Sequence, residues 1–316
     1  ATDRPTGGNP GNDRRSGNYP GRFKSSRRDG SGIDRQARSS IRSLEHPRSR
    51  STIIRENSQS LVLGTRGSRL ARAQTEHVVT LLKRSHPGLN IEIRVIRTEG
   101  DIDRTSPLAS FGGRGAFVRS IENALLEGNI DAGVHSLKDL PSRLPDGLML
   151  GSVPGREDPR DVLVASSGRS FGSLPAGSVV ATGSDRRRIQ AAALRPDLVF
   201  APMRGNIETR IGKVGGEGID GVMLAAAGLK RLGLGGLVTQ TFEPDDILPA
   251  PCQGALVLEC REGDSRVIEL VGAIENSFAR LCADCERAFI ETLGLGCHAP
   301  VAALAVSTVD EIRLDT

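Results

Sequence analysis

The feature that most constrains the fold is an alternation, from Leu61 onward, of short β-rich runs with amphipathic stretches. "LVLGT" is typical of a buried strand, and the stretch after it places Ala71, Val78 and Leu82 on one helix face. "IEIRVIR" and "DAGVHS" are typical of further strands, and "AFVRSIENALLEG" between them predicts a helix with Gly128 as its C-cap. Because strands alternate with helices, the sequence predicts parallel βαβ units and an α/β fold class.

A second series of the same kind follows the turn-rich "PGREDPRD" at residues 154–161. "DVLVAS", "SVVATGS", "LVFAPMRG" and "DGVMLAA" predict strands, with helices starting near Asp185 and Asn206 and a short one at 228–232. The strand "GALVLEC" (254–260) is expected to return to the first sheet, as in two-lobed α/β binding proteins whose chain crosses twice. A last unit runs from the helix "FARLCADCERAFIETL" into "APVAALAV".

The first 60 residues differ from the rest in composition and charge. They hold thirteen basic residues against six acidic ones, while the whole chain of 316 residues has a net charge of +4, so the remainder is net negative. The basic excess therefore does not mark the folded part as a nucleic-acid-binding protein. With little apolar surface to offset its ordering entropy, residues 1–60 are expected to form a disordered basic extension.

Three roles are open for this extension. Its Arg- and Ser-rich composition suits a transit peptide for a plastid or another organelle, although its six acidic residues argue against one. An inert extension on a cytoplasmic protein is the alternative, and a nucleic-acid arm is favoured least. Elsewhere the longest apolar runs, such as "GVMLAAAGL", are far shorter than the roughly 20 residues of a membrane span, so no membrane partner is expected.

Arginines and hydroxyl side chains stand where the predicted strands end. These residues are Arg66, Ser68, Thr182, Ser184, Arg186, Arg187, Arg204 and, about one helical turn farther on, Arg210. In an open α/β sheet, ligands bind at the carboxyl ends of strands, where helix N-termini present free N–H groups. The arginine fork binds carboxylates through two hydrogen bonds. The pattern therefore predicts a small molecule with several carboxylates, or a phosphorylated one; unrelated surface arginines are the alternative.

Asp139 stands at an equivalent junction, in "VHSLKDLP". A carboxylate among cations stays ionised, so it can hold a cationic intermediate or accept a proton, and in a desolvated cleft it can also donate one. A helix N-cap, or a salt bridge to Lys138 or an arginine, is the alternative. His135, inside the predicted strand, is expected to be packed rather than catalytic.

Five cysteines are an odd number in a chain with no evident secretory signal, which argues against a disulfide framework. They are Cys252, Cys260, Cys282, Cys285 and Cys297. "CADC" lies in a helical pattern without a second pair at zinc-ribbon spacing, so no metal is expected even with Cys297 and His298 nearby. Cys297 lies in the loop-like "LGLGCHAP", where a mobile thiol is accessible for covalent attachment.

Nine segments, in order, resemble the porphobilinogen deaminase (hydroxymethylbilane synthase) family over about residues 61–310. They are "GTRGSRLARAQ", "GGRGAFVRSIENALL", "DAGVHSLKDLP", "REDPRDVLV", "SDRRRIQ", "RGNIETR", "AAAGLKRLGL", "QGALVLECR" and "CERAFIETLGLGCHAP". The resemblance implies two periplasmic-binding-protein-like lobes around a cleft and a small α+β third domain that carries the cofactor cysteine. The implied boundaries are 61–157 with 249–273 for domain 1, 158–248 for domain 2 and 277–316 for domain 3.

The resemblance also implies an enzyme, a transferase of haem and chlorophyll (tetrapyrrole) biosynthesis that acts as a monomer. Cys297 would carry a dipyrromethane cofactor through a thioether. Four porphobilinogen molecules would be added to this primer in turn, each losing ammonia, before water releases hydroxymethylbilane. The partners would then be porphobilinogen and the growing polypyrrole, both polycarboxylates, and not a nucleic acid.

The resemblance carries roles onto individual residues. Asp139 matches the family's catalytic aspartate. The positions that match the family's substrate- and cofactor-binding residues are Arg66, Ser68, Ser136, Lys138, Thr182, Ser184, Arg186, Arg187, Arg204, Arg210 and Arg231. The Gly-rich segment 99–115 resembles a mobile loop over the cleft. Arg114 lies in this loop, and Phe117 just beyond it would stack on a pyrrole or else pack in the core.

Three departures from the family pattern stand out. Ser110 occupies a position where many members have lysine, and "ATGSDRRR" replaces the commoner Thr-Ser-Ser-Leu-Arg-Arg. Cys252 occupies a position where many members have a small residue, which adds a second candidate for a reactive thiol. The chain's last residues, "DEIRLDT", precede further strand and helix in the usual third domain, so that domain is expected to be C-terminally incomplete.

Two other classes of protein share some of these features. A two-lobed anion-binding protein without catalysis would have the same fold and arginines but would need neither Cys297 nor Asp139. A thiol-based redox or metal protein would instead use Cys282, Cys285 and Cys297.

Overall fold

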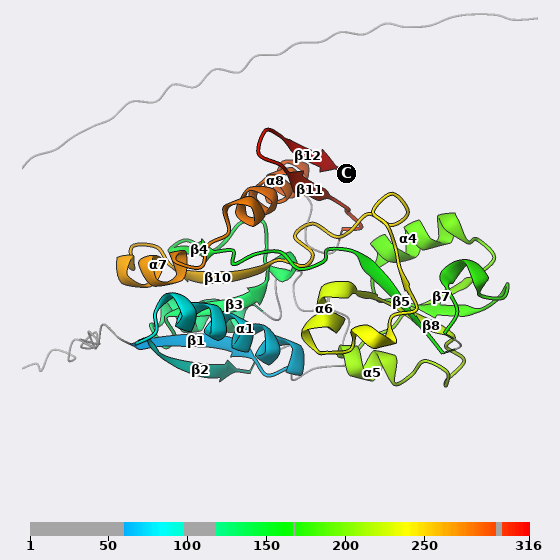
Figure 1. Ribbon diagram of the computed structural model, residues 1–316, viewed down its shortest axis with the longest axis horizontal. Coiled ribbons are helices and arrows are strands. Elements are labelled where there is room, and N and C mark those ends of the chain that lie inside the picture. The colour runs from blue at the N-terminus through cyan, green and yellow to red at the C-terminus, as the bar shows by residue number, and fades with distance from the viewer. Residues whose placement is uncertain (1–59, 98–117, 167, 295–298) are drawn as a thin grey trace, which may run out of the picture. The chain divides into compact units, whose positions relative to one another are not determined.

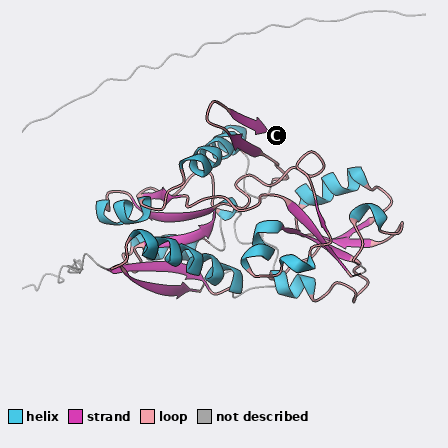
Figure 2. Ribbon diagram, viewed as in Figure 1, coloured by secondary structure: helices cyan, strands magenta, loops and turns pink. Residues whose placement is uncertain are grey.

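The computed structural model describes residues 60–97, 118–166, 168–294 and 299–316. Over these residues the chain forms two five-stranded sheets and one two-stranded sheet, with helices packed against them (Figures 1 and 2). No helix in this part of the chain is both long and apolar enough to cross a membrane.

The first sheet has the strand order β2-β1-β3-β10-β4. Its strands are β1 (Ser60–Arg66), β2 (Asn90–Ile96), β3 (Ala132–Ser136), β4 (Leu148–Ser152) and β10 (Leu256–Arg261). β1 pairs in parallel with β2 and β3, whereas β10 runs antiparallel between β3 and β4. The strand expected to return to the first sheet therefore does so, but the prediction of parallel pairing holds for only part of this sheet.

Helices cover both faces of the first sheet. α1 (Arg69–Ser85) and α7 (Ser265–Gly272) share one core with the sheet, to which Val78 contributes. α3 (Arg119–Leu126) packs on the other face through a second core that includes Ile121. Successive side chains of a strand point to opposite faces, so the continuous apolar run of β1 supplies both cores. We call this sheet with its three helices the first lobe.

The second sheet has the order β7-β6-β8-β5-β9 and, with its helices, forms the second lobe. Its strands are β5 (Asp161–Ala165), β6 (Val179–Ala181), β7 (Val199–Ala201), β8 (Gly221–Ala225) and β9 (Gln240–Thr241). β6 is parallel to β7 and β8, and β5 is antiparallel to β8 and β9. In each lobe a single strand runs against the others, β10 in the first and β5 in the second, and each of these strands directly follows a crossing between the lobes.

The helices of the second lobe also lie on both faces. α4 (Asp185–Leu194) shares a core with Phe171 and Phe242, whose rings meet edge to face with centroids 5.3 Å apart. α5 (Ile207–Ile211) and α6 (Ala226–Arg231) contribute to a separate core. These three helices begin near the positions that the sequence predicts.

The chain crosses between the lobes twice, from β4 to β5 and from β9 to β10. The two crossing segments pair with each other: Arg156 and Ala255 form an isolated antiparallel bridge, and the Glu157 N–H donates to the Gly254 carbonyl at 3.1 Å. The lobes are therefore joined by a short two-stranded connection rather than by two independent linkers.

A third unit consists of α8 (Ser277–Leu293) and the hairpin of β11 (Leu304–Ser307) with β12 (Ile312–Asp315). The Asn276 side chain caps α8 by accepting a backbone N–H at 2.9 Å, and the helix ends at Gly294 with a left-handed φ of 63°. The prediction of two α/β lobes plus a small α+β unit is thereby confirmed.

Glu286 ties the third unit to the crossing segments. This fully buried carboxylate on α8 accepts hydrogen bonds from Arg156 Nη1 at 2.6 Å, from the Ala305 N–H at 2.6 Å and from the Cys252 N–H. A buried charge is tolerated when it is paired and hydrogen-bonded, as Glu286 is.

Gly254 lets the two crossing segments approach closely. Its φ is +89°, and a Cβ at this position would overlap the backbone oxygen of Glu157. We expect Gly254→Ala to lower the free energy of unfolding by about 2 kcal/mol more than Gly263→Ala does. Gly263 is a matched control, because its φ is +79° but nothing lies within 4 Å of the added Cβ. Urea unfolding measures both, and equal losses would contradict this account of the crossing.

Candidate functional site

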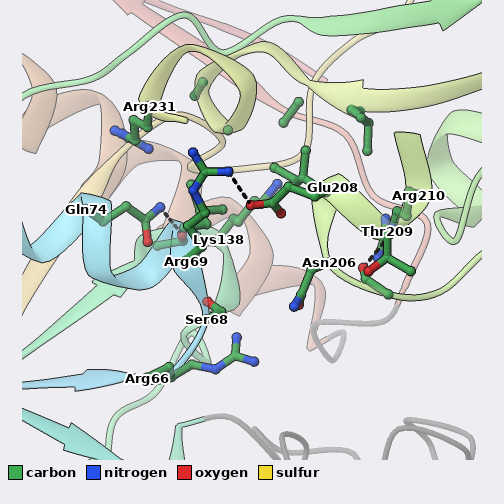
Figure 3. A pocket seen from close by; sticks show the side chains of 18 of the residues that line it. Arg66, Ser68, Arg69, Gln74, Lys138, Asn206, Glu208, Thr209, Arg210 and Arg231 are labelled. Carbon is green, nitrogen blue, oxygen red and sulfur yellow. Dashed lines mark hydrogen bonds and ion pairs between the residues drawn. The ribbon is translucent and has the colours of Figure 1, made fainter. Parts of the chain in front are cut away.

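A pocket of about 800 Å³ is lined by residues of both lobes (Figure 3). The polar lining residues of the first lobe are Arg66, Ser68, Arg69, Gln74, Ser136 and Lys138. Those of the second lobe are Arg187, Arg204, Asn206, Glu208, Thr209, Arg210, Lys213 and Arg231. Gly254 and Ala255 of the crossing complete one side. The site therefore lies where the two lobes and the crossing meet.

The pocket is strongly positive. Eight of its lining residues are lysine or arginine, and Glu208 is the one acid among the described residues that line it. Burial, and then the neighbouring charges of Arg187 and Arg204, lower the pKa of Arg210. These positive charges repel one another, and a bound multivalent anion would relieve the repulsion. The site therefore suits a polycarboxylate or a phosphate.

Two neighbouring parallel strands of the first lobe end at the pocket. Arg66 is the last residue of β1, and Ser68 then caps α1 by accepting the Ala71 N–H at 3.2 Å. Ser136 ends β3, and its hydroxyl accepts a hydrogen bond from the Gln74 amide at 2.8 Å. The side chains thus gather at the carboxyl edge of the sheet, where open α/β folds bind ligands.

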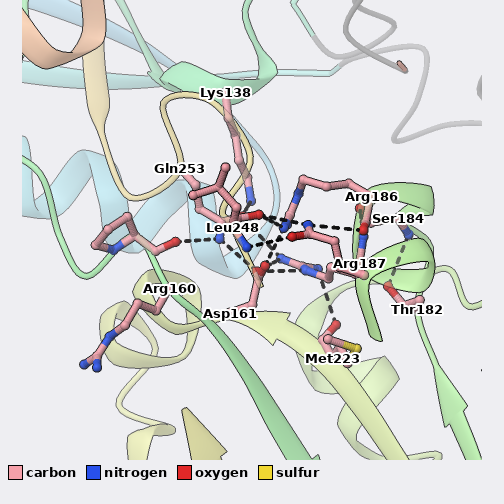
Figure 4. Close-up of polar contacts among 12 residues, drawn as sticks. Lys138, Arg160, Asp161, Thr182, Ser184, Arg186, Arg187, Met223, Leu248 and Gln253 are labelled. Atoms are coloured by element: carbon pink, nitrogen blue, oxygen red, sulfur yellow. Dashed lines mark hydrogen bonds and ion pairs between the residues drawn. The ribbon is translucent and has the colours of Figure 1, made fainter. Parts of the chain in front are cut away.

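Asp161, the first residue of β5, holds two arginines of the second lobe in place beside the pocket (Figure 4). Its fully buried carboxylate accepts from Arg186 Nη1 at 2.7 Å and from Arg187 Nε at 2.8 Å. Burial acts to raise the pKa of Asp161, but the charges of Arg187 and Arg186 outweigh it and hold the pKa at about 2. The carboxylate is therefore ionised at neutral pH.

The two arginines predicted as ligand contacts at this point differ in their surroundings. Arg187 lines the pocket in addition to its bond with Asp161. Arg186 donates to Asp161 and to the Leu248 carbonyl, the latter at 2.6 Å, and it is not among the pocket-lining residues. In this geometry Arg186 holds Asp161 and the second crossing segment together.

Thr182 and Ser184 also lie beside the pocket lining rather than in it. The Ser184 hydroxyl caps α4 by accepting the Arg187 N–H at 3.4 Å, and the Thr182 hydroxyl accepts the Ser184 N–H at 3.2 Å. Both hydroxyls therefore fix the start of the helix that carries the two arginines.

Arg204, Arg210 and Arg231 line the second-lobe side of the pocket. Arg210 Nε donates to the Gly205 carbonyl at 2.7 Å, and Arg231 Nη2 donates to the Gly254 carbonyl of the crossing at 2.7 Å. Each of these two guanidiniums is thus held by a backbone carbonyl, which orients it without neutralising its charge.

Lys138 and Asp139 lie together in the 3₁₀ helix η2 (Leu137–Asp139), which follows β3. Burial, and then the positive charge of Arg187, lower the pKa of Lys138 to about 8. The Asp139 carboxylate is exposed, and among the described residues it has no side-chain hydrogen bond or ion pair. Within this part of the chain neither structural alternative for Asp139, an N-cap or a salt bridge, is present.

Two family models match the chain almost end to end beyond residue 60. The model described as "Porphobilinogen deaminase, dipyromethane cofactor binding domain" matches residues 61–269, and "Porphobilinogen deaminase, C-terminal domain" matches residues 280–316. The porphobilinogen deaminase of Syntrophus aciditrophicus is 47% identical over 252 residues, which cover 80% of this chain and 82% of the relative. That of Thermus thermophilus is 49% identical over 247 residues, covering 78% and 80%. The chain belongs to the porphobilinogen deaminase family.

Solved structures of other proteins show weaker likeness. The methionine-binding protein MetQ has a TM-score of 0.41 and 14% identity, covering 73% of this chain and 96% of MetQ. The effector-binding domain of BenM with benzoate has a TM-score of 0.40 and 16% identity, covering 74% and 93%. At these TM-scores the two-lobed fold rests on the sheet topology of the chain itself.

Several family positions lie outside the described residues. These are the predicted cofactor cysteine Cys297, the loop residues Ser110 and Arg114, and Phe117. Cys252 is described, and its surroundings argue against a reactive thiol: it is 2% exposed, and burial followed by Glu286 raises its pKa to about 12. His135 is packed as predicted, with Nε2 3.1 Å from Glu259 Oε2 inside the first lobe.

Gln253 is a site residue that the sequence analysis missed. Fully buried in the crossing, its Oε1 accepts from Lys138 Nζ at 3.2 Å and from Arg187 Nη2 at 3.3 Å, and its Nε2 donates to Asp161 Oδ1 at 2.8 Å. It therefore links a pocket lysine of the first lobe to the arginine pair of the second. The signal available in the sequence was a lone glutamine between the turn "PAPC" and the buried strand "GALVLEC".

Replacing Asp161 by asparagine would leave the buried Arg186 and Arg187 without their shared anion. We expect Asp161→Asn to lower the free energy of unfolding by about 3–5 kcal/mol at neutral pH. Because folding lowers the pKa of Asp161 from 3.8 to about 2, its contribution is present above the ordinary value and is lost as pH falls toward 2. Urea unfolding should therefore show the difference between wild type and variant shrinking below about pH 4.

Asp185→Asn is the matched control, because Asp185 is exposed and pairs with the exposed Arg188 at 2.9 Å. Its free energy of unfolding should stay within about 0.5 kcal/mol of wild type. Similar losses of unfolding free energy in the two variants would show that the buried Asp161 cluster stabilises the protein no more than an exposed ion pair does.

Proposed function

We propose that the protein is a porphobilinogen deaminase, a transferase of tetrapyrrole biosynthesis. It joins four porphobilinogen molecules head to tail on a dipyrromethane primer, with loss of ammonia at each step, and hydrolysis releases hydroxymethylbilane. Family membership supports this activity, and the observation that carries it is the pocket lined by eight cations, one of which is Lys138, the residue before Asp139 in η2. Porphobilinogen carries an acetate and a propionate, so the growing chain is a polyanion.

The described residues fit the dipyrromethane group, which carries four carboxylates. A pocket of about 800 Å³ is within the usual size of small-molecule sites, and its cations come from several directions. Arg66, Arg204, Arg210 and Arg231 would hold the carboxylates. Joined to Cys297 through a thioether, the group would supply the free pyrrole carbon to which the first porphobilinogen is attached.

The chain's own residues would divide the electrostatic work. The arginines would bind and orient the peripheral carboxylates, while Asp139, next to the pocket-lining Lys138, would balance the positive charge that develops as porphobilinogen loses ammonia. The same carboxylate would accept the proton that leaves the pyrrole carbon after the new bond forms. The domain boundaries given by the family resemblance, and action as a monomer, are part of this proposal.

Intact-mass spectrometry tests the proposal most simply. Wild-type protein should carry a dipyrromethane adduct, and Cys297→Ser should lack it because the thioether sulfur is gone. Cys285→Ser on α8 is the control and should keep the adduct, since Cys285 is proposed to have no covalent role. An unmodified mass in protein that turns over porphobilinogen would refute the cofactor assignment.

Asp139→Asn should reduce turnover of porphobilinogen by at least about a hundredfold, because the amide can neither balance positive charge nor accept the proton. The adduct and the unfolding midpoint should be retained, since Asp139 is exposed and its carboxylate makes no hydrogen bond or close ion pair among the described residues. Asp146→Asn, an exposed aspartate seven residues farther on, should turn over normally. Wild-type turnover by Asp139→Asn would remove Asp139 from the mechanism.

Lys138 predicts a pH dependence of substrate binding. Its pKa is lowered from 10.5 to about 8, so the ammonium is lost as pH rises through that value. Because binding of a carboxylate favours the charged form, KM for porphobilinogen should rise above about pH 8. Lys138→Arg keeps its charge and should flatten this profile. The same step in the arginine variant would assign it to another group.

A further inference from the structure

One ion pair joins a helix of the first lobe directly to a helix of the second. Arg69 Nη1, at the start of α1, lies 3.4 Å from Glu208 Oε1 on α5 (Figure 3). Both side chains line the pocket, and Glu208 is the acid noted above among eight cations. The hydrogen bonds from Lys138 and Arg187 to Gln253, from Lys230 to Glu157 and from Arg231 to the Gly254 carbonyl instead run through the crossing segments.

The pair lies where the two lobes touch. A Cβ on Gly228 of α6 would come within 2.7 Å of Ile207 Cδ1 on α5 and 3.9 Å of Leu70 Cδ2 on α1. The absence of a side chain at Gly228 therefore lets α5 pack closely on α6, and Leu70 of α1 lies in van der Waals range of the same point, so the three helices meet beside the Arg69–Glu208 pair.

The pair is weak and replaceable. The Arg69 side chain is 67% exposed and that of Glu208 is 34% exposed, and a single nitrogen and oxygen meet. Exposed pairs of this kind contribute little and are screened by salt. A carboxylate inside a site built for polyanions repels the ligand, so Glu208 has an evident use only if it moves off Arg69 when the ligand arrives.

We propose that Arg69 is a further carboxylate-binding residue of the pocket and that Glu208 occupies it until a ligand carboxylate takes its place. Without ligand, the pair holds the lobes together across the pocket. On ligand entry the Glu208 carboxylate is exchanged for one of the ligand's, which frees the contact between α1 and α5. This inference rests on the proposed function for the nature of the ligand, a polycarboxylate pyrrole chain.

A double-mutant cycle on binding tests the exchange without requiring turnover. Mellitate (benzenehexacarboxylate) serves as an unreactive polycarboxylate, and isothermal titration calorimetry measures its Kd for the full-length holoenzyme. Glu208→Gln should tighten binding about two- to fivefold, because Arg69 no longer has an internal partner, and Arg69→Gln should weaken it by a similar factor. In the Arg69→Gln background, Glu208→Gln should then change Kd by much less.

The cycle separates exchange from general charge effects. If Glu208 acted only by repelling anions, its removal would tighten binding equally with and without Arg69, and that additive result would overturn the inference. Arg313→Gln and Asp315→Asn on β12 are the control, since they remove an exposed pair of the same kind outside the pocket and should leave Kd unchanged.

The same variants keep the two proposals distinguishable. Coupled mellitate binding in a protein that does not turn over porphobilinogen would support the exchange and count against the proposed function alone. Additive effects of the two substitutions on mellitate binding, in a protein with normal turnover, would overturn the exchange and leave the proposed function supported. No mellitate binding by wild type would overturn the exchange but not the polyanion pocket, because in the holoenzyme the dipyrromethane carboxylates already occupy part of that pocket.

Discussion

The buried Asp161 carboxylate is the interaction on which the arrangement of the site depends. It has no exposed surface, and it is kept ionised by two arginines and a glutamine amide. Removing one member of such a group leaves a buried charge uncompensated, so the side chains of the group must keep their positions relative to one another. Asp161 begins β5 directly after the first crossing, and Gln253 belongs to the second. The pairing therefore fixes the lobes' connection and the position of Arg187 together.

The third unit joins the same arrangement through Arg156. Its guanidinium binds Glu286 of α8 on one side and, through Nε, the backbone carbonyl of Gln253 at 2.9 Å on the other. The acids near the crossing are thus turned toward internal partners, as Glu157 also is, 2.7 Å from Lys230. Because these carboxylates pair with residues outside the pocket, they do not neutralise its arginines and lysines. A polycarboxylate would neutralise this excess of positive charge.

Much of the fold followed from the sequence because its elements have clear periods and boundaries. α1 has a cap at Ser68 and a regular apolar stripe, and β1, β3 and β8 are buried on both faces. β4 and α7 were missed. "LMLGS" is too short to show a period, and α7 starts from an Asp264 cap inside a polar stretch. The antiparallel direction of β10 depends on the path of the crossings, which no local pattern encodes.

The site was predictable in its charge but not in its internal pairing. Arginines at strand ends indicated an anion pocket, and Arg66, Arg187, Arg204 and Arg210 line it. Spacing could not show that Arg186 would turn to Asp161, because that contact joins residues 25 positions apart through the sheet. Gln253 and the Arg69–Glu208 pair arise in the same way, from segments that only the fold brings together.

A crystal structure of the holoenzyme would show whether the positive pocket between the lobes holds the carboxylates of a pyrrole chain. We expect carboxylate oxygens within hydrogen-bonding distance of Arg66, Arg204, Arg210 and Arg231, with Arg186 and Arg187 still paired to Asp161. A pyrrole chain bound elsewhere, or Asp161 stripped of its arginines by the ligand, would contradict this expectation.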